Sequence, residues 1–171
     1  MKYLVKILTF LCFSFFSYSQ DHSVDFYFLE ILNEYREKRR IPKLELDSNL
    51  TKAAQDHANY IHYEVTKNLN SEGYSHIQNN LDNPFYSGVK PVDRLSKYEG
   101  IKYKKTGENI VRFGNDTNKG IAEFIFKLWL TSPDHKRIML DKSYKKIGLG
   151  LKYDKNNNKI KNGYAVLLLS N

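Results

Sequence analysis

The sequence has a single cysteine among its 171 residues and only four prolines. Cys12 lies inside an N-terminal apolar segment, so removal of that segment leaves a chain with no thiol. A chain without thiols cannot form disulfides, thiolate metal sites or a cysteine nucleophile. We therefore expect the fold to be held by its core, and any metal or catalytic chemistry to use other side chains.

Residues 1–19 have the pattern of a secretory signal peptide. Two lysines precede an apolar run over residues 7–16, and the segment ends in the small-x-small triplet Ser-Tyr-Ser. This pattern predicts cleavage between Ser19 and Gln20. The apolar run is shorter than the roughly 20 residues that a membrane-spanning helix needs. We expect a secreted or periplasmic protein with no transmembrane segment in its mature form and a single domain over residues 20–171.

The charge is positive but not concentrated. Lysine and arginine total 27 against 19 aspartate and glutamate, and the basic runs are interrupted by acidic and apolar residues. A spread of this kind predicts a solvated basic surface and no nucleic-acid partner. A weak attraction to anionic lipid or cell-wall polymer stays open.

Apolar periodicity predicts both helices and strands. Helical spacing covers residues 24–40, 48–67 and 117–131, with short helices at 92–98 and 133–140; β-rich runs cover 108–113, 146–153 and 164–170. The last two runs predict an antiparallel hairpin joined by the polar stretch 154–163, and residues 68–91 read as a long irregular loop. The third long helix is expected to bury Ile121, Phe124, Ile125, Leu128 and Trp129. This pattern predicts an α+β fold in which helices surround a small antiparallel sheet.

Several residue patterns suggest a metal-binding or catalytic motif but lack the spacing or the residues that the motif requires. His57 and His62 are five residues apart and fall on different faces of a helix, so they are interpreted as packing and surface residues. The stretch from Asp154 begins like a calcium loop but has Lys159 where glycine is required, and a hairpin turn explains it better. The sequence has no nucleophile elbow, phosphate loop or dinucleotide fingerprint.

Three polar residues stand in unusual places: His76 in the irregular loop, Glu108 at the start of a strand, and His135 in the first turn of a short helix. The positive end of that helix disfavours a protonated His135 and so favours neutral imidazole, which is the form that binds metals. Ser132, before Pro133, is expected to cap the same helix.

These residues belong to a longer ordered pattern that resembles the CAP superfamily of cysteine-rich secretory proteins, antigen 5 and pathogenesis-related proteins, in its compact, cysteine-free bacterial branch. The pattern consists of Leu32-Asn33-x-x-Arg36, Leu44-x-Leu46-Asp47, His57-Ala58, Ser75-His76, Gly107-Glu108-Asn109-Ile110, Trp129, Ser132-Pro133-x-His135 and Ile147-Gly148-Leu149-Gly150. The ordered combination is specific, although each piece alone is weak.

The resemblance implies a three-layer α-β-α sandwich with a central cleft. In family members this cleft is lined by two histidines and two acidic residues that can bind a divalent metal, most often zinc. Carried over by position, His76 and His135 are the imidazole pair and Glu108 is the first carboxylate. In many family members the second carboxylate lies three residues after the tryptophan, and in this sequence that position is Ser132. Two imidazoles and one carboxylate still suffice for a tetrahedral zinc with one water.

Two functions remain open on the sequence. The first is an exported binding module for a lipid, a glycan or another cell-envelope ligand, with Tyr74, Phe85 and Tyr86 of the irregular loop as candidate contacts. The alternative is a metal-dependent hydrolase of peptide or cell-wall substrate, with Glu108 as the candidate catalytic residue. If Glu108 ligates a metal it cannot also act as a free base, so binding is favoured over hydrolysis.

Overall fold

The computed structural model describes residues 23–69, 75–98, 103–114, 118–156 and 159–171. Within these residues the chain order is α1 (Val24–Glu37), β1 (Glu45–Leu46), α2 (Ser48–Thr66), α3 (Pro91–Ser96), β2 (Thr106–Phe113), α4 (Asn118–Thr131), α5 (Pro133–Met139), β3 (Lys146–Asn156) and β4 (Lys159–Ser170). The expected signal peptide lies outside the described residues. Among the helices that are described, none has the length and apolar character to cross a membrane.

The strands form one sheet in the order β1-β3-β4-β2. The predicted hairpin is present: β3 and β4 are antiparallel, with Ile147 opposite Leu169. Its strands are longer than predicted and take in most of the polar stretch 154–163, because backbone pairing continues from Asp154 opposite Lys161. The predicted antiparallel sheet is present in β3, β4 and β2, and the two-residue β1 adds a short parallel pairing with β3, so the sheet as a whole is mixed.

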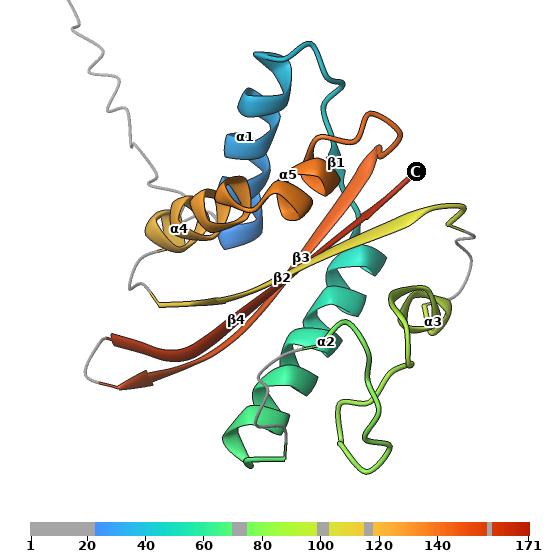
Figure 1. Ribbon diagram of the computed structural model, residues 1–171, viewed down its shortest axis with the longest axis vertical. Helices are drawn as coiled ribbons and strands as arrows, with labels where there is room; N and C mark the ends of the chain where they lie inside the picture. The colour runs from blue at the N-terminus through green and yellow to red at the C-terminus, as the bar shows by residue number, and fades with distance from the viewer. Residues whose placement is uncertain (1–22, 70–74, 99–102, 115–117, 157–158) are drawn as a thin grey trace, which may run out of the picture.

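Both faces of the sheet are buried, which confirms the three-layer sandwich. Alternate residues of β4 point to opposite faces. Leu167 and Leu169 belong to the core shared with α1, α4 and α5, whereas Val166 and Leu168 belong to the core shared with α2. Figure 1 shows the two helical layers, with α1, α4 and α5 on one side of the sheet and α2 and α3 on the other.

Helix α4 buries most of the predicted face, since Ile121, Ile125 and Trp129 are buried. Trp129 is fully buried and meets the ring of Phe28 on α1 edge-on at 5.3 Å, as expected for a core tryptophan. Phe124 is exposed, however, and Phe126 is buried in its place. The helix contacts both α1 and the sheet, so its buried surface turns toward Ala122 and Phe126, a shift that periodicity within one helix does not show.

Helix α2 lies directly on the backbone of β3. It begins at Asp47, whose carboxylate accepts hydrogen bonds from the backbone N–H groups of residues 49 and 50 at 2.9 and 3.1 Å. A Cβ added to Gly148 would lie 2.2 Å from the carbonyl carbon of Leu50, and one added to Gly150 would lie 2.2 Å from that of Ala54. The two glycines therefore allow the helix to approach the strand closely.

A side chain of α2 also occupies the lateral edge of β3. The backbone of β1 covers this edge only at its start, where the N–H of Asp47 donates to the carbonyl of Ile147 at 2.9 Å. Farther along, the amide of Gln55 donates to the carbonyl of Leu151 at 2.7 Å and accepts from its N–H at 3.1 Å. The Gln55 amide thus makes the two hydrogen bonds that a neighbouring strand would make.

Candidate functional site

The candidate site is built around β2, which is an edge strand of the sheet. Successive side chains of a strand point to opposite faces. Glu108 points to the face covered by α2, whereas Asn109 points to the face covered by α5 and donates from Nδ2 to the carbonyl of His135 at 3.0 Å. The Gly-Glu-Asn sequence therefore ties both helical layers to the same edge.

Both oxygens of the buried Glu108 carboxylate are engaged. One accepts a hydrogen bond from His76 Nδ1 at 2.8 Å, and the other forms an ion pair with Nη2 of Arg94. Burial raises the pKa of Glu108, but the hydrogen bond from His76 and the charge of Arg94 more than offset it and hold the pKa below its ordinary value. Glu108 is therefore an ionised, fully paired group at neutral pH.

Arg94 is a site residue that the sequence analysis missed. It projects from α3 and is completely buried. Besides its ion pair with Glu108, it donates from Nη1 to the carbonyls of His76 and Val89, each at 3.2 Å. Arg94 thus joins the strand to both ends of the irregular loop. Nothing in the sequence indicates that Arg94 is buried, because arginines on short helices are usually exposed.

His57 also belongs to this site, although the sequence analysis interpreted it as a packing or surface residue. Its Nε2 donates to the carbonyl of Ser75 at 2.9 Å and lies 3.9 Å from Glu108. Its Nδ1 accepts from the side-chain amide of Gln78 at 3.0 Å. A ring with one donating and one accepting nitrogen is neutral. Burial lowers the pKa of His57 to about 4, in agreement with this assignment.

The two predicted imidazoles differ in exposure. His76 is largely exposed, and because its Nδ1–H donates to Glu108, Nε2 is the ring atom left for a ligand. His135 is half-buried in the first turn of α5, and burial together with the charge of His76 lowers its pKa. The direction agrees with the expectation of a neutral His135. Ser132 occupies the cap position as predicted, but its side chain makes no capping hydrogen bond.

The described residues do not fit the predicted three-ligand metal set. In the part of the chain that the structure covers, no three histidine, cysteine, aspartate or glutamate side chains form a group that could hold a metal ion. Glu108 does not serve as a metal ligand in this arrangement, because Arg94 and His76 already pair with its two oxygens. Its geometry is that of a group that orients His76 through the ring N–H. Metal binding by His76 and His135 stays a prediction.

The irregular loop is fixed to α2 by polar contacts. The hydroxyl of Tyr60 accepts from the backbone N–H groups of Asn79 and Asn80 at 3.0 and 2.9 Å. The buried carboxylate of Glu64 accepts from the side-chain amides of Asn80 and Asn83, both at 2.8 Å. The loop therefore lacks regular secondary structure but has a defined conformation over its described residues.

The three loop aromatics proposed as ligand contacts differ in their surroundings and exposure. Tyr74 lies outside the described residues. Tyr86 is half-buried and packs against the core shared with α2, so its described role is to anchor the loop. Phe85 is exposed and lies edge-on to Tyr63, with 6.2 Å between ring centroids.

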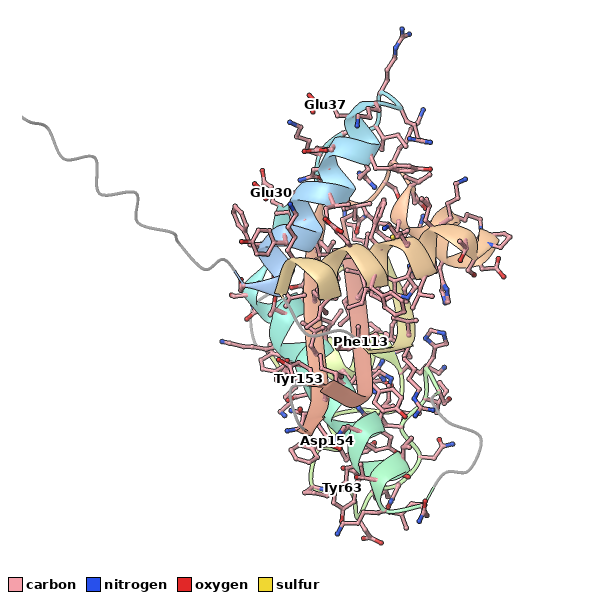
Figure 2. The ribbon with its side chains drawn as sticks, turned by 90° about the vertical axis from the view of Figure 1, so that its left-hand side faces the viewer. Glu30, Glu37, Tyr63, Phe113, Tyr153 and Asp154 are labelled. Carbon is pink, nitrogen blue, oxygen red and sulfur yellow. The ribbon has the colours of Figure 1, made fainter. Side chains whose placement is uncertain are left out.

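A surface hollow of about 280 Å³ lies on the opposite helical layer, beside α1. It is lined by Leu29, Glu30, Asn33, Glu34 and Lys43, and Figure 2 marks its position through Glu30. None of the predicted site residues lines it. The imidazoles around β2 and this hollow are therefore separate surfaces.

Comparison with known families matches residues 29–169 to the cysteine-rich secretory protein family, CAP. This span includes every residue of the site around β2 and all of the sheet except Ser170. The resemblance inferred from the ordered motifs is thereby confirmed.

Individual relatives are distant. The chain is 28% identical over 122 residues to the uncharacterized protein YkwD of Bacillus subtilis, and it spans 40% of the length of that protein. An extracellular SCP-domain protein of Bacillus anthracis superposes with a TM-score of 0.61 at 20% identity, covering 86% of this chain and 40% of that protein. An outer surface protein of Borrelia burgdorferi gives 0.57 at 24% identity, covering 85% and 88%. These structural likenesses support the fold.

Proposed function

Because the chain belongs to the cysteine-rich secretory protein (CAP) family, we propose that it is an extracellular binding module whose ligand contacts the imidazoles of His76 and His135. An exported location agrees with the signal-peptide pattern of residues 1–19 and with the extracellular and outer-surface relatives. The ligand class that suits the site best is a hydroxyl-rich glycan of the cell envelope, because the exposed groups there are polar rather than apolar.

The arrangement of Glu108 carries this proposal. Its carboxylate is buried, ionised and paired on both oxygens, so it holds His76 in one orientation and has no free oxygen for a substrate. Hydrogen-bonding groups held in place by a rigid supporting network bind with a smaller entropy loss. Such a network favours recognition of a ligand over proton transfer at Glu108.

The hydrolase alternative has no comparable support in the described residues. A hydrolase needs a positioned base together with a group that polarises the scissile bond. Glu108 was the candidate for the first role, and its two partners exclude it as a free base. Turnover of peptides or peptidoglycan fragments by zinc-loaded protein above a His135→Ala control would restore this alternative.

Co-sedimentation with purified peptidoglycan tests the proposed function. We expect the protein to bind, and His76→Ala and His135→Ala each to weaken binding about tenfold or more, since each removes a hydrogen-bonding group from a site with few of them. His62→Gln is the matched control, because His62 pairs with Asp154 at 3.0 Å, away from the site. Equal binding by all three variants would contradict the proposal.

Zinc titration into metal-stripped protein tests the metal prediction separately. If His76 and His135 hold zinc, each alanine variant loses binding. Glu108→Gln then weakens it by a smaller factor, about 10- to 100-fold, as expected for a group that orients a ligand. Absence of zinc binding in the unmodified protein would leave the imidazoles as hydrogen-bonding groups only.

A further inference from the structure

Basic residues from two separate stretches of the sequence meet at the start of β2. Lys105 donates from Nζ to the carboxylate of Asp141 at 2.6 Å and to the hydroxyl of Ser143 at 3.0 Å. The backbones of the two stretches also meet at Ser170, which donates from its hydroxyl to the carbonyl of Lys105 and accepts from the N–H of Lys145. Figure 1 shows the connection from α5 to β3 at the same end of the sheet as the start of β2. We call the cations of these stretches the α5-end patch: Lys104, Lys105, Lys136, Arg137, Lys142 and Lys145.

The α5-end patch has an excess of positive charge. Its six cations stand against three carboxylates, which are Asp134 and Asp141 in the same stretches and Glu45 beside them. Glu45 is placed there by its N–H, which donates to the carbonyl of Lys145 at 2.9 Å. Ion pairs between described residues involve only two of the six cations, and all of the cations except Lys136 are exposed. Because gathered like charges repel one another, a bound anion would lower the free energy of this surface.

The ammonium group of Lys105 is held in place at the centre of the patch. It lies 5.0 Å from the ring centroid of Tyr144. Asp141, which accepts from it, is itself fixed by the backbone N–H and the hydroxyl of Ser143 at 2.8 and 2.6 Å. An ammonium group has three N–H donors, and Asp141 and Ser143 take two of them. The third donor is therefore left for an anionic ligand at a fixed position, which reduces the entropy lost on binding.

The α5-end patch adjoins the His76–His135 site. Asn109 of β2 lies against the first turn of α5, where its Nδ2 donates to the carbonyl of His135 at 3.0 Å. Lys105 instead contacts the residues that follow the last turn of α5. Residues 105 and 109 are about 13 Å apart along an extended chain. A ligand of a few sugar units laid beside β2 can therefore contact the patch and the imidazole of His135 together.

We propose that the α5-end patch binds the phosphate or carboxylate groups of an acidic glycan whose sugar chain extends along β2 to His135. This inference rests on the proposed function and names the class of glycan that the site takes. Lysine and arginine bind such anions through charge-assisted hydrogen bonds, and a chain with repeated anionic groups meets several cations at once. A neutral glycan would not account for the excess of positive charge beside the site.

Isothermal titration of protein recovered in its exported form with dextrans of one chain length tests the class of ligand. We expect phosphorylated or carboxymethyl dextran to bind about tenfold or more tighter than neutral dextran, and raised salt to remove the difference. The two acidic dextrans, compared at equal charge, show which anion the patch prefers. Polyglutamate of the same charge is the control for an acidic polymer without sugar. Equally tight binding of polyglutamate would overturn the proposal, as would acidic dextrans that bind no better than neutral dextran.

Two pairs of lysine variants test the location. Lys142→Gln/Lys145→Gln removes two exposed charges of the patch and should weaken binding to the acidic dextran about tenfold or more. Lys67→Gln/Lys119→Gln makes the same change in net charge at the end of α2 and the start of α4, and should bind nearly as the unmodified protein does. Equal losses in the two pairs would mean that net charge, not this patch, drives binding, and would overturn the proposal.

The histidine variants separate this inference from the proposed function. His135→Ala should also weaken binding to the acidic dextran, because the sugar chain reaches that imidazole. Histidine variants that lose peptidoglycan binding, in a protein with no preference for acidic dextran, would overturn this inference and leave the proposed function standing. Binding of acidic dextran that depends on Lys142 and Lys145, with both histidine variants unaffected on dextran and on peptidoglycan, would overturn the proposed function and the extension of the ligand to His135.

Discussion

Arg94 and Glu108 form an ion pair in which both side chains are buried. Removing two charges from water is costly, and the cost is offset only when the geometry is good and the remaining hydrogen-bonding groups are satisfied. Arg94 meets this condition at Nη1 through two loop carbonyls, although its buried Nε has no hydrogen-bond partner among the described residues, and Glu108 meets it through His76. The pair therefore couples the strand, the short helix α3 and the irregular loop in one network.

Arg94→Met should destabilise the protein by about 3–5 kcal/mol, because it leaves the Glu108 carboxylate buried without a cation. Unfolding in urea, followed by circular dichroism, measures this loss. The double variant with Glu108→Gln should recover part of it. Arg137→Met is the control, since Arg137 pairs with Asp134 at 3.6 Å on the exposed surface and should cost less than about 1 kcal/mol. Similar losses for the two arginines would contradict the assigned role of the buried pair.

His57 should make stability depend on pH between about 6.5 and 4. Burial lowers its pKa in the folded protein from 6.5 to about 4, so the unfolded chain binds the proton more tightly. The stabilisation is complete above pH 6.5 and is lost as the pH falls toward 4, and it amounts to about 3 kcal/mol over this range. Urea unfolding at a series of pH values measures the slope.

The matched variants for this prediction are His57→Gln and His135→Gln. Replacement of His57 should remove most of the slope between pH 6.5 and 4.5. The His135 variant should keep most of it, because His135 is only half-buried although its pKa is also lowered. Below about pH 4.5 both variants should still lose stability, since the lowered pKa of Glu108 has the same sign of effect. An unchanged slope in His57→Gln would refute the prediction.

Gly148→Ala should cost about 3 kcal/mol or more, because the added methyl group meets the backbone of α2 rather than a movable side chain. Thermal unfolding gives the loss. Gly114→Ala is the comparison, since the nearest atom to its added Cβ lies 3.4 Å away, and it should have a small effect. If Gly148→Ala unfolds at the same temperature as the original chain, α2 does not rest on β3 as closely as described.

Glu64→Ala should loosen the irregular loop more than it affects the rest of the fold. The side-chain amides of Asn80 and Asn83 would lose their buried acceptor, at a cost of about 1–3 kcal/mol. Amide hydrogen exchange, followed by mass spectrometry, should be faster at Asn79 and Asn80, whose N–H groups donate to Tyr60. Exchange in β4 should be unchanged. Glu30→Ala on α1 serves as a control, and equal exchange in both variants would argue against an anchoring role for Glu64.

The sequence predicts the fold well where a local pattern determines it. Asp47 opens α2 because its short carboxylate can accept from free N–H groups, and this signal lies within four residues. The hairpin is visible as two β-rich runs. The strand β1 is not visible, since two residues carry no period, and Phe124 was assigned to the wrong face because the packing of α4 on α1 depends on distant residues.

The site was predicted in part for the same reason. His76, Glu108 and His135 were identified from the order of family motifs, and the structure places Glu108 in contact with His76. Arg94 and His57 were missed, because their significance comes from burial beside Glu108 and not from their neighbours in the sequence. A buried arginine and a neutral, hydrogen-bonded histidine become recognisable only after the chain brings α2, α3 and β2 together.

The Gln55 amide on the edge of β3 bears on how the protein behaves at high concentration. An uncovered strand edge can recruit a strand from another molecule and begin aggregation. By occupying both the N–H and the carbonyl of Leu151, Gln55 interrupts the row of free backbone groups beyond β1. One side chain of a helix thereby helps to keep neighbouring copies of the chain from joining their sheets.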